Sequence, residues 1–194
     1  ADWIVYTKVF DGSNDYKILN SNSAKGDSGL PGVTDTVFSW GGGSGYSNTN
    51  GRTYIMYNWT SIPGYSKMGK YNALGSADGA YIDLGFRPAF ILIRPTNNFG
   101  GSDQNYSTWG LWDSTRSTSN VVTYAGMLTA NMNSPEQVRG NGSNDGALAA
   151  FDILSDGFKI RGSSYEVGYN GTYFFMAFAE QPGNTPFDTE TNAR

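Results

Sequence analysis

The sequence contains one pattern twice: NGTYFFMAFAEQPG at residues 170–183 and GRTYIMYNWTSIPG at residues 51–64. Successive side chains of a strand point to opposite faces, and both faces of each stretch are apolar for most of its length. Each stretch is therefore predicted to be a central strand covered on both sides, as in the interior of a sandwich. The side chains expected in this core are Ile55, Tyr57, Trp59, Phe174, Met176 and Phe178.

The composition predicts an all-β fold. The chain has 194 residues, of which 26 are Gly, and its charged and aromatic fractions are 15% each. Gly, Asn, Ser, Thr and Asp separate short aromatic and aliphatic runs, which is typical of many short strands joined by tight turns. No stretch of ten or more residues has a convincing helical period.

The absence of two residue types, and the net charge, narrow the range of possible functions. The sequence has no Cys and no His, so it lacks thiolate chemistry, the commonest general base and the commonest zinc ligand. The formal charge of −4 and the pI near 4.7 argue against nucleic acid or an anionic membrane surface as a partner. No apolar run approaches the ~20 residues that span a bilayer.

The repeat predicts the domain organisation. Shorter matches in the same order favour duplication, giving two related antiparallel β-sandwich units of jelly-roll or lectin-like type, packed together. The first unit lacks a counterpart of YIDLGFRPAFILIRPT (81–96), so we expect it to be truncated and the chain to be part of a longer polypeptide. One alternative is a first unit that evolved without this hairpin and borrows a strand from a neighbour. The other is a single larger double-sheet body. The predicted divisions are 1–64 (first unit), 65–80 (packed crossover), 81–187 (second unit) and 188–194 (tail).

Several words of the sequence carry a family resemblance. They are GYSKMGKY, GSADGAYIDLGFRPAFILIRPT, WGLWDSTR, LSDGFKIR and GTYFFMAFAEQP, followed by the ending TETNAR. In this order they resemble a family of Gly/Asn-rich domains in virion proteins of tailed bacteriophages, especially marine and cyanobacterial phages. The resemblance covers most of residues 50–194 and is weaker over residues 1–49.

The resemblance implies a structural role at the virion surface. Domains of this kind usually lie near the C-terminus of tail fibres, tail-tip adhesins or capsid decorations. The biochemical activity of such domains is generally unassigned. Taken with the duplication, the missing His and Cys and the acidic charge, the resemblance favours a non-enzymatic homo-oligomer, a trimer if the protein forms a fibre, with other virion proteins as partners and host attachment as a further role. The resemblance supplies no functional residues.

A carbohydrate-binding module is the alternative function. Aromatic faces stack on sugar rings, and the loop segments around several aromatic residues are too polar to be buried. Trp109 and Trp112 point to opposite faces of a short strand, so at most one is expected in the core. The glycan-contact candidates are Tyr46, Tyr106, Trp109, Tyr165 and Tyr169.

Metal and hydrolytic sites are less well supported by the pattern. The segments 11–15, 75–79 and 141–146 combine Asp, Asn and Gly, but Asx-turns explain them without calcium. Paired carboxylates in a depolymerase are a weaker hypothesis, because the sequence shows no pair at the required separation. The carboxylates near predicted strands are Asp83, Asp152, Asp156, Glu166 and Glu180. We therefore assign no catalytic residue, metal or cofactor.

Overall fold

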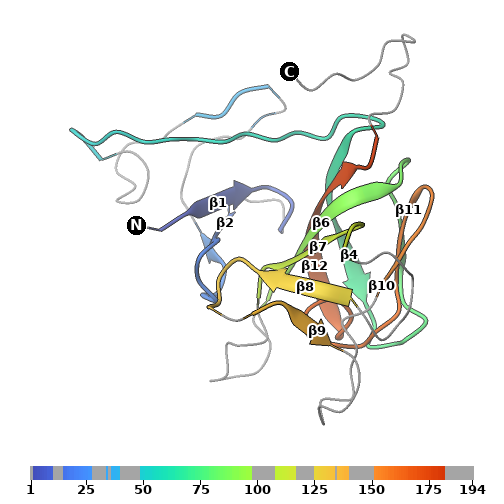
Figure 1. Cartoon of the computed structure of the whole chain (residues 1–194). Helices are drawn as coiled ribbons and strands as arrows, with labels where there is room; N and C mark the ends of the chain where they lie inside the picture. The colour runs from blue at the N-terminus through green and yellow to red at the C-terminus, as the bar shows by residue number, and fades with distance from the viewer. Residues whose placement is uncertain are drawn as a thin grey trace.

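The protein is all-β (Figure 1). The computed structural model describes residues 2–10, 15–27, 34, 36–39, 49–97, 108–116, 125–133, 135–139 and 151–181. These residues contain strands and turns and no helix. Their strands form three antiparallel sheets, one of six strands and two of three.

The large sheet contains the three longest strands, β4 (Ser66–Ala73), β6 (Pro88–Pro95) and β12 (Gly171–Ala179). Its order is β4, β12, β6, β7 (Gly110–Asp113), β8 (Ala125–Thr129) and β9 (Gln137–Arg139). β12 pairs with all of β4 on one side, over Gly171–Phe178, and with β6 on the other. The last strand of the sequence is therefore central in the sheet.

Two small sheets accompany the large one. The first has the order β10 (Phe151–Ile153), β11 (Gly157–Ile160) and β5 (Tyr81–Asp83). The second consists of β1 (Ile4–Thr7), β2 (Asp15–Ile18) and β3 (Gly26–Asp27), and we call it the N-terminal sheet. Figure 1 shows these two sheets on opposite sides of the large sheet.

Two apolar cores occupy the two faces of the large sheet. On one face Phe175 packs edge-on against Phe158 of β11, with ring centroids 5.7 Å apart. On the other face Phe174 packs edge-on against Phe10, which follows β1, at 5.5 Å. Alternation along β12 sends one side chain to each core in turn. The expectation that residues 172–178 form a central strand covered on both sides is confirmed.

The matching prediction for residues 51–64 is wrong. Residues 52–60 form no strand, and the exposed fraction of Ile55 is 74%, whereas that of its counterpart Phe174 is 4%. Tyr57 and Trp59 are also exposed, while Met176 and Phe178 are half-buried. A strand of this composition is buried only where neighbouring strands pair with it and other layers cover its faces. β12 has both, and residues 52–60 have neither.

The prediction of two related units is corrected accordingly. The N-terminal residues form a three-stranded sheet that covers the large sheet, rather than a truncated copy of residues 81–187. Residues 65–80, expected to be a crossover, contain β4, an edge strand of the large sheet. The predicted tail at residues 188–194 lies outside the described residues.

Truncation at matched positions of the two similar stretches measures this difference. Phe174→Ala removes a buried ring and is expected to lower the free energy of unfolding by about 3–5 kcal/mol. Ile55→Ala is expected to change it by less than about 0.5 kcal/mol, because the side chain is already hydrated. Urea unfolding at a protein concentration where the chain is monomeric gives both values. Equal losses would contradict the assigned burial.

Candidate functional site

The most unusual surface of the molecule is an extended segment of residues 51–62, which we call the arm. Every residue in it is exposed. Its apolar side chains have exposed fractions of 74% for Ile55, 61% for Tyr57 and 58% for Trp59. Tyr54, Met56 and Ile62 are exposed as well. Contiguous exposed apolar surface of this kind marks an interaction site in a soluble protein.

Three aromatic rings form a row on this surface. Trp3 stacks on Tyr57 with ring centroids 6.3 Å apart and planes inclined by 27°. Tyr57 in turn stacks on Trp59 at 6.0 Å and 26°. We call Trp3, Tyr57 and Trp59 the aromatic row. Figure 1 shows the arm running across the top of the view, from the upper end of β4 to a point past β1 and β2.

Hydrogen bonds hold the arm at its two ends. Near the start, the Thr49 N–H donates to the Tyr54 hydroxyl at 3.1 Å. At the other end, Ile62 pairs with Ser66 at the beginning of β4. Within the described residues, the backbone of residues 55–59 makes no hydrogen bond. The middle of the arm is therefore available to form a ladder with another strand.

Trp109, a predicted glycan contact, is buried. Its indole N–H donates to the Ile18 carbonyl at 2.9 Å, and its ring packs edge-on against Phe174. Trp112 is also fully buried, in the other core. The expectation that at most one of the two is in the core is wrong, because both faces of the large sheet are covered. Trp109 therefore cannot stack on a sugar.

Two of the remaining glycan candidates, Tyr165 and Tyr169, lie side by side in the turn that precedes β12. Tyr165 is half-buried and Tyr169 is 41% exposed, and their ring centroids lie 4.4 Å apart. The Tyr173 hydroxyl donates to both of their carbonyls, at 3.0 Å and 3.1 Å, which fixes this turn against β12. Tyr46 and Tyr106 lie outside the described residues.

Two of the carboxylates considered for hydrolysis are in ion pairs with arginine. Arg161 Nε donates to Asp152 at 2.6 Å, and Arg87 Nε donates to Glu180 at 2.8 Å. A third, Asp83, accepts the Gly85 N–H in a turn. These contacts account for the three carboxylates as structural residues, without a role in hydrolysis.

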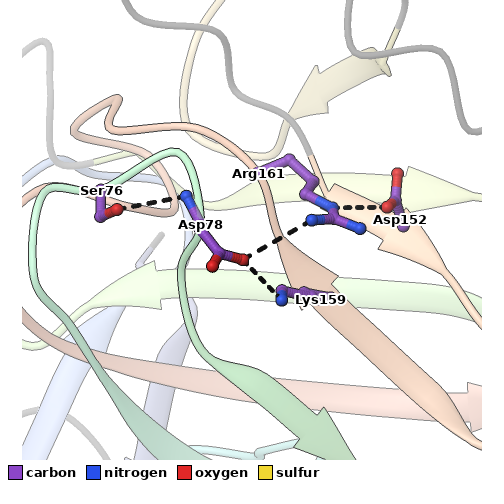
Figure 2. Close-up of polar contacts among 5 residues, drawn as sticks. All are labelled: Ser76, Asp78, Asp152, Lys159 and Arg161. Atoms are coloured by element: carbon purple, nitrogen blue, oxygen red, sulfur yellow. Dashed lines mark hydrogen bonds and ion pairs between the residues drawn. The ribbon is translucent and has the colours of Figure 1, made fainter.

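An ion-pair network ties the loop at residues 75–79 to the β10–β11 sheet. Figure 2 shows Asp78 between Lys159 and Arg161, and Arg161 reaching on to Asp152. Lys159 Nζ lies 2.6 Å from Asp78 Oδ1, and its hydrogen bond and charge lower the pKa of Asp78. The Asp78 carboxylate thus faces cationic side chains, which do not suit a calcium ligand. No group of three or more Asp or Glu in the described residues is placed to hold a metal ion.

A buried cation, Lys17, lies between the N-terminal sheet and the large sheet. Lys17 is fully buried, and within the described residues its Nζ has no hydrogen-bond partner. Asp15, on the same face of β2, accepts from Lys25 at 2.9 Å. Burial, with the charges of Arg94 and Lys25 nearby, lowers the pKa of Lys17 to about 7. Desolvation of an unpaired ammonium disfavours its charged form.

Arg94 reaches from the large sheet into the same layer. Its guanidinium donates to the Ser23 carbonyl at 2.9 Å and to the Ser21 carbonyl at 3.3 Å. The guanidinium carbon also lies 5.3 Å from the centroid of the Trp109 ring. Burial lowers the pKa of Arg94 to about 9. These contacts attach the N-terminal segment to β6.

The sequence analysis missed Lys17 and Arg94. The available signal was alternation: Asp15 and Lys17 share one face of a short strand, and Arg94 follows Phe90 and Leu92 on one face of β6. A charge on an otherwise apolar strand face was a reason to expect a buried polar contact. The pattern did not indicate which layer would cover it.

The fold and the arm define an all-β module with an exposed apolar strand-like segment. Residues 1–182 match the family described as "Domain of unknown function (DUF7483)", so the chain belongs to that family. No curated protein matches the chain significantly. No solved structure matches it significantly. Among the described residues, no helix is long and apolar enough to cross a membrane.

The buried ammonium predicts a pH dependence of stability. Above pH 7 the folded state loses the Lys17 proton while the unfolded chain keeps it up to about pH 10. The free energy of unfolding should therefore rise between pH 7 and pH 9, by about 2 kcal/mol. Lys17→Met should remove most of this rise, leaving the smaller part that comes from Arg94, whereas Lys70→Met, at an exposed position, should preserve it. Urea unfolding at both pH values tests this, and an unchanged slope in Lys17→Met would contradict it.

Proposed function

We propose that this chain is a non-enzymatic structural module of the tailed-bacteriophage virion surface. Its place is a tail fibre, a tail-tip adhesin or a capsid decoration. It assembles with copies of itself, as a trimer in a fibre, and with other virion proteins, and it contributes to attachment to the host. The arm is the surface that makes its assembly contacts.

The exposed arm is the observation that carries this proposal. Isolated exposed apolar residues are common on soluble proteins, but the arm gathers Ile55, Tyr57 and Trp59 in one extended segment. Hydrating this surface costs free energy that an interface would recover. Tyr and Trp are also the residue types that are enriched at protein interfaces.

Two further observations support a structural role. The chain has no His and no Cys, and Asp152 and Glu180 are in ion pairs with arginine. The resemblance of GYSKMGKY, LSDGFKIR and GTYFFMAFAEQP to virion domains supports the particle surface as the location. An assembly role accounts for both the exposed arm and the resemblance to virion domains, whereas a catalytic role accounts for neither.

Light scattering of the purified protein tests self-assembly. We expect a mass of two or more chains for the natural sequence. The double variant Tyr57→Ser/Trp59→Ser should shift the mass toward that of one chain, 21.0 kDa, because it removes two aromatic anchors from the arm. Tyr169→Ser, which changes an exposed tyrosine elsewhere, should leave the mass unchanged.

A strictly monomeric natural protein at high concentration would contradict assembly through the arm.

The location on the virion is tested separately, by labelling purified phage particles with an antibody against the chain and imaging them. A label on the tail or on the capsid supports the proposal and distinguishes a tail protein from a capsid decoration. Particles without label would contradict the virion location.

Carbohydrate binding is a second candidate, favoured by the aromatic row. Three exposed rings in a row, with successive planes inclined by 27° and 26°, offer an apolar surface that sugars of a polysaccharide can contact. This site differs from the loop aromatics predicted from the sequence, because it combines the arm with Trp3. The row would bind host-surface polysaccharide without cleaving it.

Trp3 separates this candidate from assembly, since it lies in the aromatic row but not in the arm. On a glycan array, Trp3→Ala should lose binding if the row binds sugars, while its mass in light scattering stays that of the natural protein. Tyr169→Ala is the matched control and should keep binding. Absence of binding by the natural protein across a broad array would remove this candidate.

A further inference from the structure

β4 presents an open edge. It pairs with β12 on one side, and on the other side, among the described residues, only Ile62 pairs with it. The N–H and C=O groups of Ser66 both bond to Ile62, each at 2.9 Å. Backbone groups alternate in direction along a strand, so those of Met68, Lys70 and Asn72 point to this same edge.

Two serines end the ladder after one residue pair. The Met68 N–H, which a longer hairpin would give to the Thr60 carbonyl, donates instead to Ser61 Oγ at 3.0 Å. The Thr60 carbonyl accepts from Ser66 Oγ at 2.7 Å. The arm leaves β4 at this point. Beyond it, the described residues provide no strand for the edge at Lys70 and Asn72.

The register that the Ile62–Ser66 pair begins would match the arm to this edge. Continued along both strands, it sets Trp59 opposite Gly69, Tyr57 opposite Tyr71 and Ile55 opposite Ala73. On its other side, β4 already faces β12, with Phe175 opposite Gly69 and Tyr173 opposite Tyr71. An aromatic side chain would then stand on both sides of β4 at each of these two positions. The likeness between the arm and β12 fits two strands that flank the same neighbour.

The side chains at this edge suit the arm. Tyr71 is buried and stacks on Tyr173 with centroids 5.2 Å apart and planes inclined by 9°, so Tyr57 would extend this stack. Directly opposite residues share a face of the sheet, which directs the apolar set of the arm toward the main core. Just beyond β4, Leu74 is 80% exposed, and the same register sets Tyr54 opposite it.

In this chain the arm does not fold back on its own β4. It extends past the N-terminal sheet (Figure 1). There Tyr57 packs against Trp3. Only Pro63, Gly64 and Tyr65 connect Ile62 to Ser66, and the φ of Gly64 is +73°. Within the described residues, one molecule thus carries an extended segment without a partner strand and, beyond Ser66, a β4 edge without one, and the two have matching registers. Exchange of such elements between identical chains is a common route to oligomers.

We propose that the arm of one chain adds as an extra strand to the β4 edge of a second copy of the chain. This inference rests on the proposed function, because it identifies the contact by which the module assembles. The added strand supplies main-chain hydrogen bonds to Lys70 and Asn72, and its apolar side chains give the contact its register. Two-fold or cyclic exchange satisfies every arm and every edge.

Disulfide cross-linking tests the register, and the natural chain has no cysteine to interfere. Asn58→Cys and Lys70→Cys are made as separate variants, mixed and oxidised. Both side chains are exposed, and the register sets them directly opposite each other, within the Cα separation that a disulfide needs. We expect a shift from 21.0 kDa to the mass of two chains on a gel run without thiol, and its loss when thiol is added. The matched control pairs Asn58→Cys with Asn72→Cys, two residues out of register and beyond disulfide reach, and should give little product.

The possible outcomes separate the inference from the proposed function. Cross-linking of the 58/70 mixture in large excess over the 58/72 mixture supports strand exchange. An oligomeric natural protein that gives no 58/70 product overturns the inference and leaves assembly standing. A double variant Asn58→Cys/Lys70→Cys that cross-links only within single chains overturns it in favour of closure on the chain's own β4. A monomeric natural protein overturns both.

Discussion

Burial of β12 on both faces is the constraint on which the rest of the structure depends. Tyr173 and Phe175 fill the core shared with the β10–β11–β5 sheet, and Phe174 fills the core shared with the N-terminal sheet. A strand that is apolar on both faces is stable in water only when a layer covers each of them. The three-layer arrangement follows from this one strand, and so does the burial of both Trp109 and Trp112.

The N-terminal sheet packs on the large sheet through apolar side chains, and the same packing buries two charged side chains. The N-terminal sheet covers Phe174 and Trp109 with apolar side chains, but it also buries Lys17 and Arg94. Arg94 recovers part of its desolvation cost through the Ser21 and Ser23 carbonyls and the face of Trp109. Lys17 has no such bonds in the described residues, and its lowered pKa reflects this. The stability of the N-terminal layer therefore depends on the protonation of Lys17.

The arm shows the same chemistry as β12 without its partners. Both stretches are rich in alternating aromatic and aliphatic side chains, yet one is central in a sheet and the other is hydrated along its length. Where the arm leaves β4, the hydroxyls of Ser61 and Ser66 take the hydrogen bonds that would continue the hairpin. A sequence that is suited to burial but exposed in the single chain is a strong argument for an intermolecular role.

The sequence by itself determined the strand content, the two apolar faces of β12 and the absence of His and Cys chemistry. These follow from local periodicity and composition, which need no knowledge of neighbours. Only the tertiary structure decided that Ile55, Tyr57 and Trp59 are exposed, that Trp109 is buried and that Ser66–Ala73 pairs with Gly171–Ala179. Burial and pairing depend on which distant segments meet. Two stretches with nearly the same letters can therefore have opposite environments, and the site proposed here exists because they do.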